Sequence, residues 1–320
     1  MIMKKNKLYK LYNPICVQGN INKRHYFEGW YYKCVDADNN YSCSFIPGFS
    51  TSNNHYKRHA FIQFIDNSNN FPIYIPYPIK SFSYSDKPFV INIGNCIFSQ
   101  SRIIVNIEHI HYNIKGKIIL GEFTDIKRNV KLPTIMGYYR YIPFMECFHS
   151  LISLSHSLKG YLNVNGKVIN FNNGTGYLEK DFGTSFPKQW VWIHSNTFAN
   201  SNTSLMCSIA SIPFVKRTFT GLICVVYVNG KEYRFATYLN ARIKKLLCSR
   251  NKLHVEITQG NYTLQINTFC SNNNILTAPK NGDMNRKIIE SMSAKIKVKL
   301  IHSNNIVLED ISCNGCVEYN

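Results

Sequence analysis

Residues 252–269, KLHVEITQGNYTLQINTF, decide the fold class. Apolar residues occupy alternate positions on either side of a polar break, at Leu253, Val255, Ile257, Leu264 and Ile266. A period of two is typical of a strand with one buried face, because successive side chains of a strand point to opposite sides. The Gln-Gly-Asn break at residues 259–261 indicates a hairpin tip. The stretch therefore predicts an antiparallel hairpin with one face in a core.

The same pattern recurs along the chain. Asn165-Gly166 and Asn229-Gly230 are strong signals for tight type I′ hairpin turns between further alternating stretches. Roughly eight strands can be placed before the break at residues 182–187 (FGTSFP) and roughly eight after it, and no long amphipathic helix interrupts them. We predict an all-β protein of two tandem lipocalin-like antiparallel β-barrels, residues 1–186 and 187–320.

Composition limits the kind of protein and its partners. The chain has 320 residues, 45% of them hydrophobic, and no apolar run near the roughly 18 residues of a membrane span. No apolar region of a signal peptide follows the basic start, so we expect a cytoplasmic protein. The net charge of +19 suits nucleic acid or an anionic membrane surface. Without a recognition helix or zinc-finger spacing, nucleic acid is disfavoured and peripheral membrane contact is the better interpretation.

Cysteine and histidine spacing argues against a metal site. The chain has 11 cysteines, and its C-x-x-C at residues 313–316 lacks the second pair that a zinc site needs. His109 and His111 would share a strand face, but no third ligand is placed to join them. We therefore expect reduced thiols and no bound metal.

Three stretches each place aromatic and ionisable side chains on one strand face. The faces carry Glu28, Trp30 and Tyr32; Tyr177, Glu179 and Asp181; and Trp190, Trp192 and His194. Closing the first barrel would pair its first strand with its last, so these groups should gather near the junction of the barrels. Two carboxyls about 6–7 Å apart in an apolar wall would raise the pKa of at least one of them. A solvated face and ordinary core packing are the alternative interpretation.

A set of short motifs, all in the same order, resembles the tocopherol cyclase family. The motifs are residues 27–33 (FEGWYYK), 44–50 (SFIPGFS), 59–63 (HAFIQ), 145–149 (MECFH), 176–187 (GYLEKDFGTSFP) and 190–196 (WVWIHSN). The resemblance implies two barrels with a ligand cavity and the closure of a prenylated quinol into a chroman ring without metal or organic cofactor. This chain has Asp181-Phe182 where plant members typically have Asn-Trp, and His194 where they have Gln, which leaves the substrate open.

On this resemblance we expect a cofactor-independent isomerase, an intramolecular lyase that cyclises a prenylated or other apolar small molecule by acid catalysis. The expected roles are proton donor for Asp181, Glu179 or Glu28; acceptor of the phenolic proton for Tyr177 or His194; and ligand contact for Trp30, Tyr32, Trp190 and Trp192. Glu146 and His149 are interpreted as a buried polar network. The alternative from another class is a non-catalytic carrier of a hydrophobic ligand.

Overall fold

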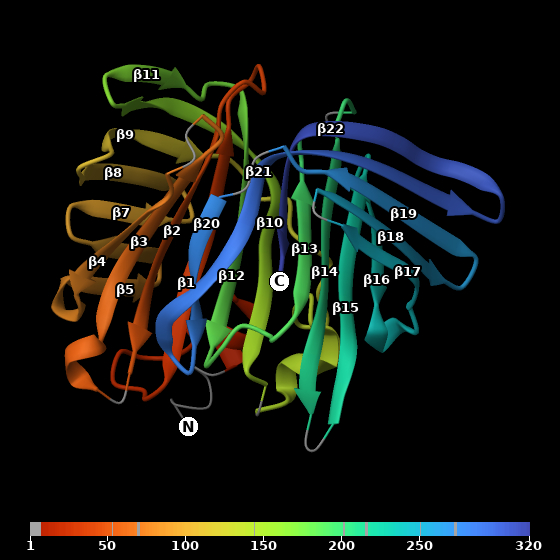
Figure 1. Ribbon diagram of the computed structural model, residues 1–320, viewed down its shortest axis with the longest axis horizontal. Coiled ribbons are helices and arrows are strands. Elements are labelled where there is room, and N and C mark those ends of the chain that lie inside the picture. Colours follow the sequence, from red (N-terminus) through yellow and green to blue (C-terminus); the bar gives the residue numbers. More distant parts are fainter. Residues whose placement is uncertain are drawn as a thin grey trace. The chain divides into compact units, whose positions relative to one another are not determined.

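Antiparallel strands make up most of the described chain (Figure 1). The computed structural model describes residues 8–52, 54–68, 71–143, 145–200, 202–214, 217–249, 251–271 and 274–320. Short 3-10 helices η1 (His55–Lys57), η2 (Ile79–Ser81), η3 (Gly137–Tyr141) and η4 (Thr237–Leu239) lie between strands. In these ranges, no helix has both the length and the apolar character needed to cross a membrane.

The chain divides into two compact units. Unit 1 comprises Met1–Phe186 and Leu276–Lys287, and unit 2 comprises Pro187–Ile275 and Ile288–Asn320. Residues 276–287, which the sequence placed with the C-terminal half, thus belong to unit 1. They are held there by local contacts: the Gln63 side chain donates to the carbonyl of Thr277 at 2.9 Å and accepts from its amide at 2.9 Å.

Unit 1 is built on one 12-stranded antiparallel sheet. Its strands are β1 (Tyr26–Val35), β2 (Ser42–Thr51), β3 (His59–Asp66), β4 (Ile73–Pro78), β5 (Phe82–Asp86), β6 (Phe89–Ile93), β7 (Cys96–Ser99), β8 (Arg102–Glu108), β9 (Asn113–Leu120), β10 (Cys147–Val164), β11 (Lys167–Asn170) and β12 (Gly174–Gly183). They follow the order β4-β3-β2-β1-β12-β10-β9-β8-β7-β6-β5, with β11 on β10. The two end strands, β4 and β5, are joined by η2 alone, so the connection brings the ends of the sheet together.

Unit 2 repeats this plan with a second antiparallel sheet. The strands of this sheet are β13 (Trp190–Ser195), β14 (Thr203–Phe214), β15 (Arg217–Val228), β16 (Lys231–Ala236), β17 (Arg242–Ser249), β18 (Lys252–Gln259), β19 (Tyr262–Phe269), β21 (Asp283–His302) and β22 (Asn305–Tyr319), with β20 (Asn274–Lys280) paired to β21. Most of β20 and the first residues of β21 fall in the segment 276–287, which belongs to unit 1. The order is β16-β15-β14-β13-β22-β21-β19-β18-β17, and η4 joins the two end strands. The predicted all-β class of two tandem antiparallel barrels is confirmed.

The predicted hairpins and the pairing of first and last strands are also confirmed. Residues 252–269 form β18 and β19, paired from Lys252 with Phe269 to Gln259 with Tyr262. Asn229 and Gly230 adopt φ values of +48° and +83°, as a type I′ turn requires. In unit 1, β1 pairs antiparallel with β12.

The two units fill their interiors differently. In unit 1 the inward side chains of β1 and β2 are aromatic, and the Tyr32 and Phe45 rings lie 5.7 and 6.1 Å from Phe98. Unit 2 has a mainly aliphatic core, to which Ile193 of β13 and Val255 of β18 both belong. Each interior is therefore a packed core that holds its sheet in shape.

Candidate functional site

Strand β12 lies between β1 and β10, and this placement creates the candidate site. Asp181 of β12 is opposite Gly29 on β1 and opposite His149 on β10. Glu179, two residues earlier on the same face, is opposite Leu151 of β10. Since directly opposite residues of an antiparallel ladder point to the same side, His149 meets both carboxylates on one face of the sheet.

Four side chains on this face form a continuous chain of polar contacts, which we call the carboxylate–histidine cluster. His149 Nδ1 lies 2.9 Å from Asp181 Oδ1, and its other ring nitrogen, Nε2, lies 3.4 Å from Glu179 Oε2. The Tyr177 hydroxyl donates to Glu179 Oε2. Each ring nitrogen of His149 thus faces a carboxylate, which is the arrangement expected for an imidazole that carries two protons.

Electrostatics favour the charged form of His149. Burial by itself disfavours the charge, but the negative charges of Glu179 and Asp181 and the hydrogen bond to Asp181 outweigh it and raise the pKa of His149 to about 9. His149 is therefore an imidazolium at neutral pH, flanked by two carboxylates. The cluster holds a proton that His149 can pass to Asp181 along their 2.9 Å hydrogen bond, and such a transfer is what general acid–base catalysis requires.

Of the two carboxylates, Asp181 is the more accessible. The Asp181 side chain is 23% exposed, against 7% for Glu179, so Asp181 is the carboxylate that solvent reaches. Across from it, a Cβ added to Gly29 would be in ordinary van der Waals contact, at 3.8 Å, with the Ile46 side chain, the Phe61 ring and the carbonyl oxygen of Pro47. Space for a methyl group, with Ile46 and Phe61 as apolar neighbours, thus lies directly beside the more exposed carboxylate.

The expected grouping of Glu28 with these carboxylates is wrong. Glu28 is opposite Phe182, one residue beyond Asp181, so its side chain lies on the other face of the sheet. There it pairs with Lys180 at 2.5 Å, and both side chains are fully buried. It also accepts hydrogen bonds from the Tyr26 hydroxyl at 2.8 Å and the Gln18 and Gly19 amides at 2.7 and 2.9 Å. Glu28 therefore anchors the N-terminal segment.

Trp30 and Tyr32 share that interior face and do not approach Asp181. The Trp30 indole donates to the carbonyl of Ile15 at 2.8 Å and packs 5.8 Å from the Phe89 ring. The Tyr32 hydroxyl donates to the carbonyl of Ser99 at 3.2 Å. Both side chains are core residues of unit 1 on the face away from Asp181, and their contact with a ligand stays a prediction.

Trp190, Trp192 and His194 lie in unit 2, on the face of β13 that points away from its hydrophobic core. All three are buried. The Trp190 indole donates to Glu318 Oε2 at 3.1 Å, and the Trp192 and His194 rings stack at 5.9 Å. Their shared face is as predicted, and their meeting with the carboxylates stays a prediction.

His149 is the site residue whose role the sequence reasoning missed, since it was interpreted as structural. The one signal that pointed to it was the motif MECFH at residues 145–149. Glu146 acts through its backbone, because its carbonyl accepts from the amide of Thr184 at 2.7 Å. The Glu146 carbonyl thus binds the chain just beyond β12, while His149 reaches Asp181.

The cluster also has the donor set of a metal site. One ligand atom each from His149, Glu179 and Asp181 lie within 4.8 Å of one another. One imidazole and two carboxylates suit a divalent cation such as Zn²⁺ or Mn²⁺. The imidazole would have to release a proton before it could bind the ion, so protonation and metal binding at His149 exclude each other.

Comparison with known proteins agrees with the motifs. The family model described as "Tocopherol cyclase-like" matches residues 105–319, about two thirds of the chain. The chain belongs to the tocopherol cyclase-like family. The matched residues of the chain include β10 and β12, and therefore all four residues of the carboxylate–histidine cluster.

Two curated relatives carry the family name. "Tocopherol cyclase, chloroplastic" of Zea mays is 25% identical over 223 residues, 63% of this chain and 45% of the relative. "Probable tocopherol cyclase, chloroplastic" of Oryza sativa subsp. japonica is 22% identical over 255 residues, 72% of this chain and 52% of the relative. The chain thus spans about half the length of these relatives. An AttH-type protein from Nitrosomonas europaea, a solved structure, aligns over 94% of both chains at 12% identity and a TM-score of 0.51, which shows a shared fold.

Proposed function

We propose that this chain is an acid–base isomerase that closes a ring in an apolar, hydroxyl-bearing small molecule. The observation that carries the proposal is the position of His149 between Glu179 and Asp181, with a pKa raised to about 9. Such a cluster stores a proton at neutral pH and keeps it beside a carboxylate that solvent reaches. Membership of the tocopherol cyclase-like family supports this reaction class.

The reaction we propose uses one proton and returns it. The proton that His149 Nδ1 holds passes to Asp181 Oδ1, which lies 2.9 Å away, and Asp181 gives it to a trisubstituted alkene. The substrate's own hydroxyl oxygen then attacks the tertiary carbocation, a C–O bond forms, and the hydroxyl proton returns through Asp181 to His149. Substrate and product are isomers. Orienting the hydroxyl for intramolecular capture can supply about 7–11 kcal/mol of the barrier reduction.

The roles within the cluster follow from its geometry. Asp181 is the group in contact with substrate because it is the more exposed carboxylate. Glu179 accepts a hydrogen bond from Tyr177 and faces His149 Nε2, so it acts as a positioning residue that keeps the imidazole oriented and charged. We place the apolar part of the substrate next to Gly29, where Ile46 and Phe61 are apolar neighbours.

The substrate class we propose is a prenylated quinol or a related prenylated phenol. Support comes from the tocopherol cyclase name of the two plant relatives and from the apolar neighbours of Gly29. We further propose that the protein works in the cytoplasm and meets such an apolar substrate at a membrane surface. The net charge of +19 supports an anionic surface.

The decisive experiment incubates the protein with a panel of prenylated hydroquinones and follows both mass and absorbance. A cyclase converts a hydroquinone into a product of equal mass and altered absorbance, whereas a carrier returns its ligand unchanged. Asp181→Asn should abolish turnover, because the amide keeps the size of the side chain but has no transferable proton. Asp38→Asn, the same change on an exposed loop, should leave turnover as in the wild type.

The outcomes separate three functions. Loss of turnover in Asp181→Asn with unchanged ligand binding supports the isomerase. If the wild type binds the ligand but does not convert it, the protein is a carrier and not an isomerase. Loss of turnover after dialysis against EDTA, restored by one added divalent cation, would assign His149, Glu179 and Asp181 to a metal site instead.

A further inference from the structure

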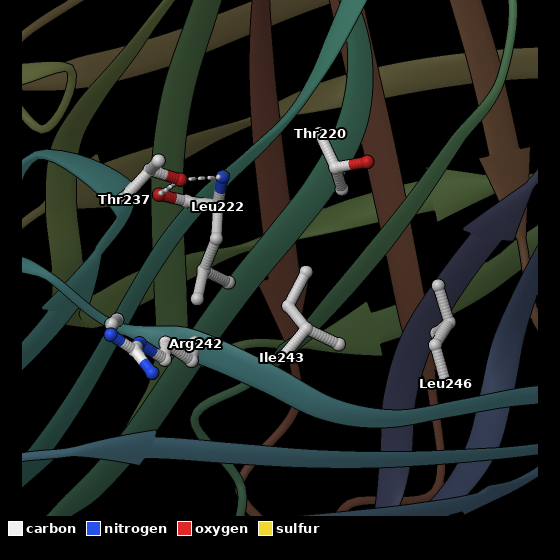
Figure 2. A pocket seen from close by; sticks show the side chains of 7 residues that line it. Thr220, Leu222, Thr237, Arg242, Ile243 and Leu246 are labelled. Atoms are coloured by element: carbon white, nitrogen blue, oxygen red, sulfur yellow. Dashed lines mark hydrogen bonds between the residues drawn. The ribbon is translucent and has the colours of Figure 1, made fainter.

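A pocket of about 460 Å³ lies in unit 2, between β15, η4 and β17, close to where the two end strands of the sheet meet (Figure 2). Its walls are mainly aliphatic and include Leu222, Ala241, Ile243 and Leu246. The Thr237 hydroxyl oxygen accepts a hydrogen bond from the backbone amide of Leu222 at 2.7 Å, which fixes one polar wall. The volume is within the range of about 300–1,000 Å³ typical of small-molecule sites.

Arg242, at the rim of this pocket, is an exposed cation without a carboxylate partner among the described residues. Pro187–Ile275 holds only two acidic residues, Glu232 and Glu256. Glu232 is bound to Arg234 at 2.6 Å, and Glu256 accepts from the Gln265 amide at 3.1 Å. Both acidic groups of this segment are thus engaged elsewhere, so a negative charge from a ligand can neutralise Arg242.

Strand β17 continues this combination of charge and apolar surface. It is an end strand of the sheet, and Lys244 and Lys245 follow Arg242 on it. Lys245 is opposite Glu256 on β18, but no ion pair within 4.0 Å joins them in the described chain. Leu246 lines the pocket and is 40% exposed. A basic strand with exposed leucine is the kind of surface that meets anionic lipid.

We propose that this pocket binds the aliphatic chain of an amphipathic anion, whose carboxylate or phosphate pairs with Arg242. The lining is aliphatic and not aromatic, which suits a flexible hydrocarbon chain better than a flat ring, and the unpaired cation at the rim selects an acidic head group. The site lies in unit 2 and shares no residue with the carboxylate–histidine cluster, so it is independent of the proposed isomerase.

Calorimetric titration with oleate tests the pocket. Arg242→Gln removes the cation and should weaken oleate binding about tenfold or more, and Leu246→Trp should weaken it similarly by filling the pocket. Lys252→Gln, the same loss of charge at an exposed position on β18, should bind within about twofold of the wild type. His149→Gln should bind oleate normally even if it has no isomerase activity, which separates this proposal from the proposed function.

Vesicles distinguish the two sources of such an anion. If Leu246→Trp also reduces co-sedimentation with phosphatidylcholine vesicles containing phosphatidylserine, the occupant comes from a bilayer lipid. If it reduces oleate binding alone, the occupant is a free fatty acid. The proposal is overturned if the wild type binds neither probe. It is also overturned if Arg242→Gln and Lys252→Gln weaken binding equally while Leu246→Trp has no effect, because binding would then be a general effect of positive charge.

Discussion

At the scale of single residues, His149 decides how the site responds to pH. Its pKa of about 9 in the folded protein lies above the value of 6.5 expected for an unfolded chain, so the folded state holds the proton more tightly. The resulting stabilisation is fully present below pH 6.5 and is lost as the pH rises through about 9. The shift corresponds to roughly 3 kcal/mol between these limits.

We therefore expect the free energy of unfolding of the wild type, relative to His149→Gln, to fall by about 3 kcal/mol between pH 6.5 and 9. Urea unfolding at a series of pH values measures this difference. His156→Gln is the matched control, because burial lowers the pKa of His156 to about 3 and it stays neutral throughout the range. An equal pH dependence in both variants would show that His149 is not the titrating group.

At the scale of elements, β12 positions the cluster, and the glycine at its end and a glycine on the neighbouring strand β1 have different roles. Gly183 ends β12 with φ of +152°, and a Cβ there would overlap the carbonyl oxygen of Glu146. The close approach of backbone on β12 and β10 thus needs glycine. Gly29 on β1 has no such restriction, since its neighbours lie at ordinary contact distance.

Substitutions at these two glycines should separate stability from binding. Gly183→Ala should lower the free energy of unfolding by roughly 1–3 kcal/mol through backbone strain and overlap. Gly29→Ala should change stability by under about 1 kcal/mol, yet reduce turnover or ligand binding, because it adds a methyl group on the face where we place the substrate, opposite Asp181. Thermal unfolding and the hydroquinone assay measure the two effects. Unchanged turnover in Gly29→Ala would move the substrate away from this position.

At the scale of the whole molecule, the burial of the cysteines shows how completely both sheets are packed. Of the 11 free cysteines, only Cys248 and Cys313 are exposed. Cys34 is opposite Cys43, and Cys207 is opposite Cys224, on neighbouring strands. Burial raises the pKa of the Cys43 and Cys224 thiols well above 9, which disfavours the reactive thiolate.

A thiol reagent such as dithionitrobenzoate at pH 8 should therefore react quickly with two thiols in the native protein and with all 11 after denaturation. The double variant Cys248→Ser, Cys313→Ser should lose the fast phase and unfold like the wild type. Fewer than 11 reactive thiols in the denatured, unreduced protein would instead reveal a disulfide. Several additional fast thiols would show that one of the sheets opens readily in solution.

The sequence by itself determined the strands, the turns and the face on which each site residue lies within its own strand. Alternation and Asn-Gly turns are local properties, because a side chain's side of a strand depends only on counting by two. Two predictions were correct for this reason: the hairpin at residues 252–269, and the shared face of Tyr177, Glu179 and Asp181. The motifs likewise identified the family before any packing was considered.

Only the tertiary structure decided which faces meet. The register of β1 against β12 sets Gly29, and not Glu28, opposite Asp181, and a shift of one residue would have exchanged the two faces. His149 comes to Asp181 from 32 residues earlier in the chain, through the pairing of β10 with β12. Neither the pairing partner nor the register is encoded in the periodicity of one strand, since both depend on how all strands of the sheet pack together.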